Sequence, residues 1–91
     1  MKGSIIMKTF EYTIKDELGI HARPAGMLAK AAKALDSEIT ITKGEKTVGA
    51  TKLMAVMGLG VKCGDTVTVT VNGGDEDASL TSIKTFLEEN L

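Results

Sequence analysis

The chain has 91 residues, of which 43% are hydrophobic and 25% are charged, and its formal net charge at pH 7 is −1. This length is enough for one domain with a modest hydrophobic core that needs neither disulfides nor a metal. The near-neutral charge offers no basic surface to nucleic acid, the 3% aromatic content offers no platform for stacked bases, and no apolar run approaches the roughly 20 residues that cross a bilayer.

The first clear pattern in the chain is a period-two alternation. Phe10, Tyr12 and Ile14 alternate with polar residues, which predicts a half-buried strand. The preceding residues 1–6 contain one lysine and a very short apolar patch without a cleavage region, so they do not resemble a signal peptide. We expect a single domain over residues 1–91, with residues 1–6 as an N-terminal extension.

A helix is predicted from Pro24 to Leu35. Proline is tolerated in the first turn of a helix, where its missing N–H leaves no bond unmade, and the residues that follow are strong helix formers. Lys30 and Lys33 lie opposite the predicted core face and are free to meet solvent or a partner. That core face is predicted to consist of Met27, Leu28, Ala31, Ala32 and Leu35.

The rest of the chain alternates short strands with two more helices. In chain order we expect a strand at 39–42, a hairpin turn at 43–46, a strand at 47–50, a short apolar segment at 52–57, a strand at 66–71 and a last helix with Asp75 as its N-cap residue. The order is strand, helix, strand, strand, short helix, strand, helix. Because each strand has one apolar face and the two longer helices can cover it, we expect an open-faced α/β sandwich with one sheet face in water.

The chain's only histidine, arginine and proline lie within four positions, at His21, Arg23 and Pro24. His21 is therefore predicted at or just before a helix N-terminus, where free N–H groups and the positive end of the helix dipole favour an anion. Arg23 adds a planar fork of donors that suits phosphate oxygens. A lone imidazole beside such an anion site favours the acceptance of a phosphoryl group.

Other roles for His21 have to be weighed against this one. A histidine near a helix start is often only a cap or a surface residue. One histidine and one cysteine, Cys63, cannot supply the ligands of a metal site, and they show no local signature of a nucleophile triad. A lone cysteine also excludes an internal disulfide framework and favours a reducing cytoplasm. We expect no metal and no cofactor.

The short apolar segment at 52–57 has two interpretations of equal weight. Methionine at helical spacing usually fills a core, and Val56 fits that role. Leu53, Met54 and Met57, however, cannot all point inward from one short helix. Adaptable methionine side chains suit a surface that has to fit several partners.

With these features together, the sequence resembles the HPr family, the histidine-containing phosphocarrier proteins of the bacterial phosphotransferase system. The resemblance runs without a gap over residues 9–87 and is strongest in GIHARPA at 19–25, LMAVMGLG at 53–60 and GD at 64–65. Motif, spacing and element order agree independently. The resemblance implies an α+β fold, an open-faced β-sandwich of order βαββαβα whose four-stranded antiparallel sheet has its helices on one face.

The resemblance also implies a role for each site residue. His21 would accept a phosphoryl group on Nδ1 from phosphorylated enzyme I, itself charged by phosphoenolpyruvate, and donate it to enzyme IIA components of sugar permeases. Arg23 would neutralise phosphate charge in both transfers. Such a protein is a phosphocarrier and not an enzyme, and we expect it to be a cytoplasmic monomer. The surface that docks both partners would comprise Pro24, Lys30, Lys33, Leu53, Met54 and Met57.

One position departs from the family pattern. Many members have a lysine-serine pair just before the short helix, and in some Gram-positive relatives a kinase phosphorylates that serine. Here the pair is Thr51-Lys52. We therefore expect a phosphocarrier without the serine switch, in which Lys52 can instead attract acidic partners.

Three alternatives remain open at this point. The chain could be an HPr-like regulatory module that docks partners without cycling phosphate. It could be a paralogue that serves nitrogen regulation or dihydroxyacetone phosphorylation instead of sugar uptake. A ferredoxin-like nucleic-acid-binding domain is suggested only by element order, and the charge and aromatic content argue against it.

Overall fold

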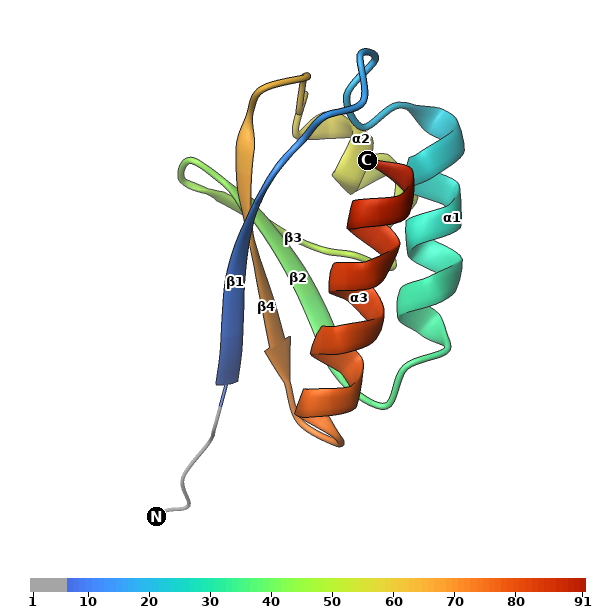
Figure 1. The fold of residues 1–91 in the computed structure, drawn as a ribbon, viewed down its shortest axis with the longest axis vertical. Helices are drawn as coiled ribbons and strands as arrows, with labels where there is room; N and C mark the ends of the chain where they lie inside the picture. The colour runs from blue at the N-terminus through green and yellow to red at the C-terminus, as the bar shows by residue number, and fades with distance from the viewer. Residues whose placement is uncertain (1–6) are drawn as a thin grey trace.

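The computed structural model describes residues 7–91, which alternate strands and helices in the order βαββαβα (Figure 1). The elements are β1 (Met7–Thr13), α1 (Ala22–Lys33), β2 (Glu38–Lys43), β3 (Lys46–Gly49), α2 (Leu53–Gly58), β4 (Thr66–Asn72) and α3 (Glu76–Asn90). The strands pair antiparallel in the order β1-β4-β2-β3. The predicted α+β open-faced sandwich is confirmed, and the expectation for residues 1–6 lies outside the described part of the chain.

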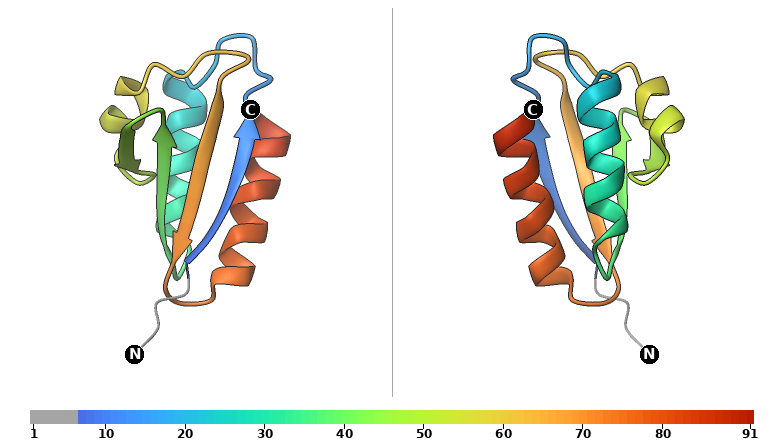
Figure 2. Two further views of the ribbon diagram at one scale, coloured as in Figure 1. Left: turned by 90° about the vertical axis from the view of Figure 1, so that its left-hand side faces the viewer. Right: turned by 90° about the vertical axis from the view of Figure 1, so that its right-hand side faces the viewer.

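Alternating valine and threonine give the sheet one apolar and one polar face. In β4, Val67, Val69 and Val71 are fully buried, and the cross-strand register sets Phe10 and Tyr12 of β1 beside them. The opposite face has no helix over it (Figure 2, left). Its strands present a row of threonines: Thr9, Thr13, Thr40, Thr42, Thr47, Thr66, Thr68 and Thr70. Because threonine suits a half-exposed strand, this face is stable in water without cover.

The helices α1 and α3 lie side by side over the apolar face of the sheet (Figures 1 and 2). Ala25, Ala29 and Ala32 of α1 are buried, and such small side chains let the helix approach the strands closely. From α3, Ile83 and Leu87 enter the same core. The carboxylate of Asp75 accepts a hydrogen bond of 3.2 Å from the N–H of Ala78, which confirms the predicted N-cap.

The predicted core face of α1 was wrong at Met27. The structure buries Leu28 and Ala32 as expected, but the helix is turned toward Ala25 and Ala29, and Met27 is 42% exposed. The reason is that alanines occur on several faces of this helix, so the sequence defines no unique apolar stripe. The helix packs by its small residues, which leaves the larger Met27 outside.

The loop between β1 and α1, the first turn of α1, the short α2 and the end of α3 all lie at one end of the molecule (Figure 1). The backbone ties these parts together. The N–H groups of Lys15 and Asp16 donate to the carbonyl oxygen of Leu91, which follows α3, and Ile14 donates to Asp65 before β4. This end of the fold positions the residues singled out by the sequence.

Candidate functional site

His21 is the N-cap residue of α1, as the sequence predicts. Its backbone is extended (φ −102°, ψ −173°), and its carbonyl oxygen accepts the N–H of Ala25 at 3.0 Å. The imidazole itself makes no capping hydrogen bond, and 36% of the side chain is exposed. The ring is therefore reachable from solvent and is not used to hold the helix.

Gly19 and Ile20 hold the loop before His21 against Val61, which lies in the segment between α2 and β4. Gly19 has φ +68°, and a Cβ on it would lie 2.3 Å from the carbonyl oxygen of Val61. Ile20 donates its N–H to that same oxygen at 3.1 Å, and its side chain is buried. Only glycine fits a backbone that combines this conformation with so close an approach. The GIH segment thus fixes the position of the imidazole through the main chain.

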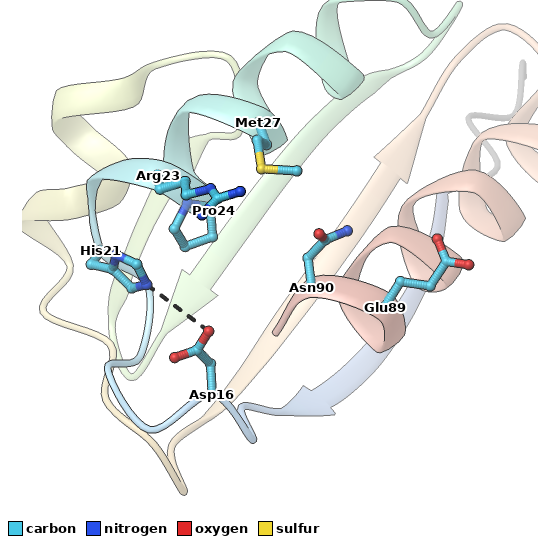
Figure 3. A pocket seen from close by; sticks show the side chains of 7 residues that line it. All are labelled: Asp16, His21, Arg23, Pro24, Met27, Glu89 and Asn90. Carbon is cyan, nitrogen blue, oxygen red and sulfur yellow. Dashed lines mark ion pairs between the residues drawn. The ribbon is translucent and has the colours of Figure 1, made fainter.

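A pocket of about 230 Å³ lies beside the imidazole (Figure 3). It forms where the β1–α1 loop and the first turns of α1 face the end of α3. The residues that line it are Asp16, His21, Arg23, Pro24, Met27, Glu89 and Asn90. The amide nitrogen of Asn90 donates to the carbonyl oxygen of Phe86 at 3.0 Å, which holds that side chain against its own helix.

Arg23 brings positive charge to this pocket. Its side chain is exposed, and it forms no salt bridge with any residue that the structure describes. The N–H groups of Ala22 and Arg23 lie in the first turn of α1, where no carbonyl of an earlier turn can accept them. Guanidinium donors, free amides and the helix dipole together favour an anion next to His21.

Asp16 is a site residue that the sequence did not reveal. One carboxylate oxygen, Oδ2, lies 3.9 Å from Nε2 of His21 (Figure 3). The other, Oδ1, accepts the N–H of Leu18 at 2.8 Å, as in an Asx turn. An acidic residue in a polar loop carries no distinguishing pattern, and only the folded loop brings Asp16 to the ring.

Apolar side chains are exposed around the same end of the molecule. Among the side chains that the structure describes, the large hydrophobic ones that stay exposed are Leu18 (72%), Met27 (42%), Leu53 (39%) and Met54 (76%). They come from the loop before His21, from α1 and from α2. Val56 is fully buried and Met57 packs partly on the core, whereas Leu53 and Met54 point to solvent. Core packing therefore explains only one side of α2. Leu18 and Met27 extend the expected surface.

The remaining predicted residues occupy different environments. Lys30 and Lys33 are exposed in the last turns of α1, where they also complement the helix dipole. Lys52 is the exposed N-cap residue of α2 and makes no capping hydrogen bond. Pro24 is buried and lines the pocket, and its expected contact with partners stays a prediction.

Cys63 lies apart from this pocket. It is an exposed free cysteine in the turn before β4, with its sulfur 3.7 Å from the carbonyl oxygen of Lys15. Within residues 7–91, no three His, Cys, Asp or Glu side chains come together as metal ligands. In the same described range, no helix has both the length and the apolar character that a membrane crossing requires.

Comparison with known proteins places this geometry among phosphocarriers. The family model described as "PTS HPr component phosphorylation site" matches residues 8–89. The chain is 40% identical over 85 residues to the phosphocarrier protein HPr of Mycoplasma genitalium, covering 92% of this chain and 97% of that protein. It is 41% identical over 83 residues to HPr of Lysinibacillus sphaericus, covering 91% and 94%.

A solved structure shows the same fold. The crystal structure of HPr from Thermoanaerobacter tengcongensis superposes with a TM-score of 0.85 at 33% identity, covering 90% of this chain and 92% of that one. The relatives that share the sequence are named as phosphocarrier proteins, which carry a phosphoryl group and are not catalytic enzymes. With the matched phosphorylation-site motif, the shared fold and the exposed imidazole at the start of α1, this chain belongs to the HPr family of phosphocarrier proteins.

Proposed function

We propose that His21 accepts a phosphoryl group on Nδ1 from phosphorylated enzyme I and passes it to enzyme IIA components of sugar permeases. The observation that carries this proposal is the imidazole of His21, which is exposed, does not cap its own helix and shares a pocket with Arg23. The lone cysteine fits a reducing compartment, and we place the relay in the cytoplasm.

For this transfer the protein has to position the imidazole and stabilise the negative charge of the phosphoryl group. A phosphoryl group moves in line between two nucleophiles, and a neutral imidazole nitrogen is a competent nucleophile for this step. Arg23 and the first amides of α1 stabilise the charge on the phosphate oxygens during both transfers. An exposed pocket suits a carrier, because the same group has to be reached first by the donor and then by the acceptor.

Docking of both partners is assigned to the apolar surface around His21. Leu53 and Met54 of α2 form its exposed centre, Met57 adds a half-buried edge, and Leu18 and Met27 extend it on the side of His21. Exposed apolar residues gathered at one end of a small protein mark an interaction site. Lys30, Lys33 and Lys52 add positive charge for partners with acidic surfaces, which speeds encounter more than it strengthens the complex.

Incubation with phosphoenolpyruvate and enzyme I tests the proposal. We expect an acid-labile gain of one phosphate by mass spectrometry, transferable to an enzyme IIA protein, and its complete loss in His21→Ala. Arg23→Lys keeps a charge but loses the planar fork, so transfer is expected to slow about ten- to a hundredfold, the equivalent of about 1.5–3 kcal/mol. A protein that binds enzyme I but gains no phosphate would instead be a regulatory module.

We also propose that control through a phosphoserine before α2 is absent and that Lys52 favours acidic partners. Lys52 is exposed at the position where a serine would stand, and it makes no capping hydrogen bond. We expect Lys52→Glu to slow transfer a few-fold at low ionic strength, with less effect in high salt, because rim charges act mainly on association.

The matched control for Lys52→Glu is Lys46→Glu, the same charge reversal at an exposed position of β3. It is expected to leave the transfer rate unchanged. Equal rates for the native protein and Lys52→Glu would refute the electrostatic role of Lys52. Efficient labelling by an ATP-dependent kinase at Thr51 or a neighbouring hydroxyl would refute the absence of a switch.

A further inference from the structure

Asp16 and His21 face each other across the mouth of the pocket. Oδ2 of Asp16 lies 3.9 Å from Nε2 of the imidazole, and both side chains are about one-third exposed (30% and 36%). Figure 3 shows the carboxylate directed at this ring nitrogen, whereas Glu89, the other carboxylate that lines the pocket, points away from the ring. No residue that the structure describes hydrogen-bonds Nδ1.

Asp16 is held in place by three hydrogen bonds, one to its carboxylate and two to its backbone. Its Oδ1 accepts the N–H of Leu18 at 2.8 Å. Its own N–H donates to the carbonyl oxygen of Leu91 at 2.8 Å, and its carbonyl oxygen accepts the N–H of Gly19 at 2.9 Å. These bonds fix the turn and leave Oδ2 as the free oxygen, directed at the imidazole. A separation of 3.9 Å is longer than a hydrogen bond, and catalytic contacts commonly tighten when the partner binds.

We propose that Asp16 is a positioning residue for phosphoryl transfer, which holds the ring proton of His21 on Nε2. The inference rests on the proposed function of His21. A neutral imidazole carries one proton, on either nitrogen, and only the nitrogen without it has a lone pair that can attack phosphorus. A carboxylate that accepts Nε2–H leaves the lone pair on Nδ1, as carboxylates do for histidines in hydrolase triads and metal sites.

The proton balance of both transfers supports this role. In the forward step the Nδ1 lone pair forms the new N–P bond, the bond from phosphorus to the donor breaks, and the proton stays on Nε2. The ring becomes cationic in this step, and the carboxylate of Asp16 stabilises that charge while Arg23 faces the phosphate oxygens. In the second step the N–P bond breaks and its electrons return to Nδ1, so that neutral imidazole leaves.

Loss of the Nε2 proton would harm both steps. A ring protonated on Nδ1 has no lone pair there for attack. A phosphorylated ring without a proton on Nε2 would have to leave as an imidazolate anion, which is a far poorer leaving group. Asp16 therefore serves acceptance and donation with a single contact, and no proton has to be exchanged with solvent between them.

The single histidine of this chain makes a direct test possible. Long-range proton–nitrogen NMR of the ¹⁵N-labelled protein, at a pH where the ring is neutral, distinguishes the two tautomers of His21 without overlap. We expect the Nε2–H form to dominate in the native protein. Asp16→Asn keeps an oxygen for the N–H of Leu18 but presents an amide donor to Nε2, so the population is expected to shift toward Nδ1–H.

Transfer kinetics with enzyme I and an enzyme IIA protein provide the second readout. We expect kcat for Asp16→Asn to fall about tenfold, as for loss of one hydrogen bond to a charged group, with the KM for the carrier unchanged. The matched control is Glu17→Gln, which removes a carboxylate from an exposed position of the same loop outside the pocket and should change neither tautomer nor rate. Unchanged amide spectra outside the loop verify that each variant is folded.

The outcomes separate this inference from the proposed function. If the native protein gains no phosphate from enzyme I, the proposed function fails, whatever the tautomer shows. If the native protein transfers phosphate but Asp16→Asn matches it in rate or in tautomer, the positioning role of Asp16 is overturned and the relay stands. An equal loss of rate in Glu17→Gln would also overturn it, because the effect would then come from the general charge of the loop.

Discussion

The exposed imidazole of His21 depends on neighbours that have no chemistry of their own. Gly19 and Ile20 press the preceding loop against Val61, and Pro24 gives α1 a first turn that needs no N–H at that position. Each of these residues acts through the backbone. The position of the ring is therefore determined by main-chain geometry, and the side chain is left free to react.

The role of Gly19 can be tested by adding a single methyl group. We expect Gly19→Ala to lower the free energy of unfolding by about 2 kcal/mol or more, because alanine is strained at positive φ and its Cβ would meet the carbonyl oxygen of Val61. Transfer through His21 should fall as well, since the loop has to move. Urea unfolding and the phosphotransfer assay measure the two effects.

Gly44 supplies the control, because it has φ +62° but open space around its Cβ position. Gly44→Ala should cost only the conformational strain and leave transfer unchanged. Equal destabilisation in the two variants would show that the contact with Val61 does not matter.

At the scale of single residues, the sequence predicted the site residues that lie close together in the chain. His21, Arg23 and Pro24 were found because a reactive side chain, its charge partner and the helix start lie within one short window. Asp16 was not found, because its approach to the ring depends on the turn closed by Leu18 and on the carbonyl oxygen of Leu91. Long-range contacts of that kind leave no periodicity in the sequence.

At the scale of secondary structure, strands and turns hold the site residues in position. The alternation in β4 and the turn residues before it predicted both elements, because burial on one face imposes a period of two. The orientation of α1 was less determined, and Met27 was misplaced, since alanines on several faces give no single stripe. The turn that joins α2 to β4 is closed by Asp65, whose Oδ2 accepts the N–H of Lys62 at 2.9 Å and lies 3.1 Å from Nζ of Lys43.

From this turn we expect a contribution to the free energy of unfolding that is lost in acid. The backbone N–H of Lys62, with the ammonium group of Lys43, holds the pKa of Asp65 below its ordinary value of 3.8. A carboxyl whose folded pKa is depressed stabilises the fold at pH values above its ordinary pKa and loses this contribution as the pH falls through the lower folded value. Asp65→Asn should therefore be less stable than the native protein at neutral pH, with a difference that shrinks below about pH 4.

Urea unfolding at a series of pH values measures this difference. Removal of the partner charge in Lys43→Gln should reproduce part of the effect, because Lys43 supplies only one of the two contacts. A difference between native and Asp65→Asn that stays constant into the acid range would contradict the assignment.

At the scale of the whole molecule, the candidate site lies at one end and a polar sheet face lies opposite the helices. His21, the pocket and the exposed residues Leu18, Met27, Leu53 and Met54 gather where the loops meet, whereas the opposite face of the sheet presents a row of threonines. The sequence predicted this layered architecture because the strands alternate in polarity and two helices suffice to cover one face. It could not predict which apolar residues stay outside, because that depends on how closely α1 and α2 pack. The monomeric state remains a prediction.

A pair of substitutions tests the division between the two faces. Met54→Ser removes the most exposed apolar side chain of the docking surface, so we expect the KM for the carrier to rise about fivefold or more with kcat unchanged. Thr68→Ser, on the opposite face, should alter neither value. Steady-state transfer from enzyme I measures both. Equal effects of the two substitutions would rule out the assigned docking surface.

The bare threonine face also makes the protein easy to handle as a tool. Because it lies on the far side of the sheet from α1, a fluorescent dye or a link to a solid support at position 68 would leave the histidine-bearing end unobstructed (Figure 2). With the native thiol at Cys63 replaced by serine, a single cysteine introduced there would give one defined attachment point. An immobilised molecule of this kind could be loaded by one partner, washed and unloaded by the next, so that each half of its cycle is timed alone.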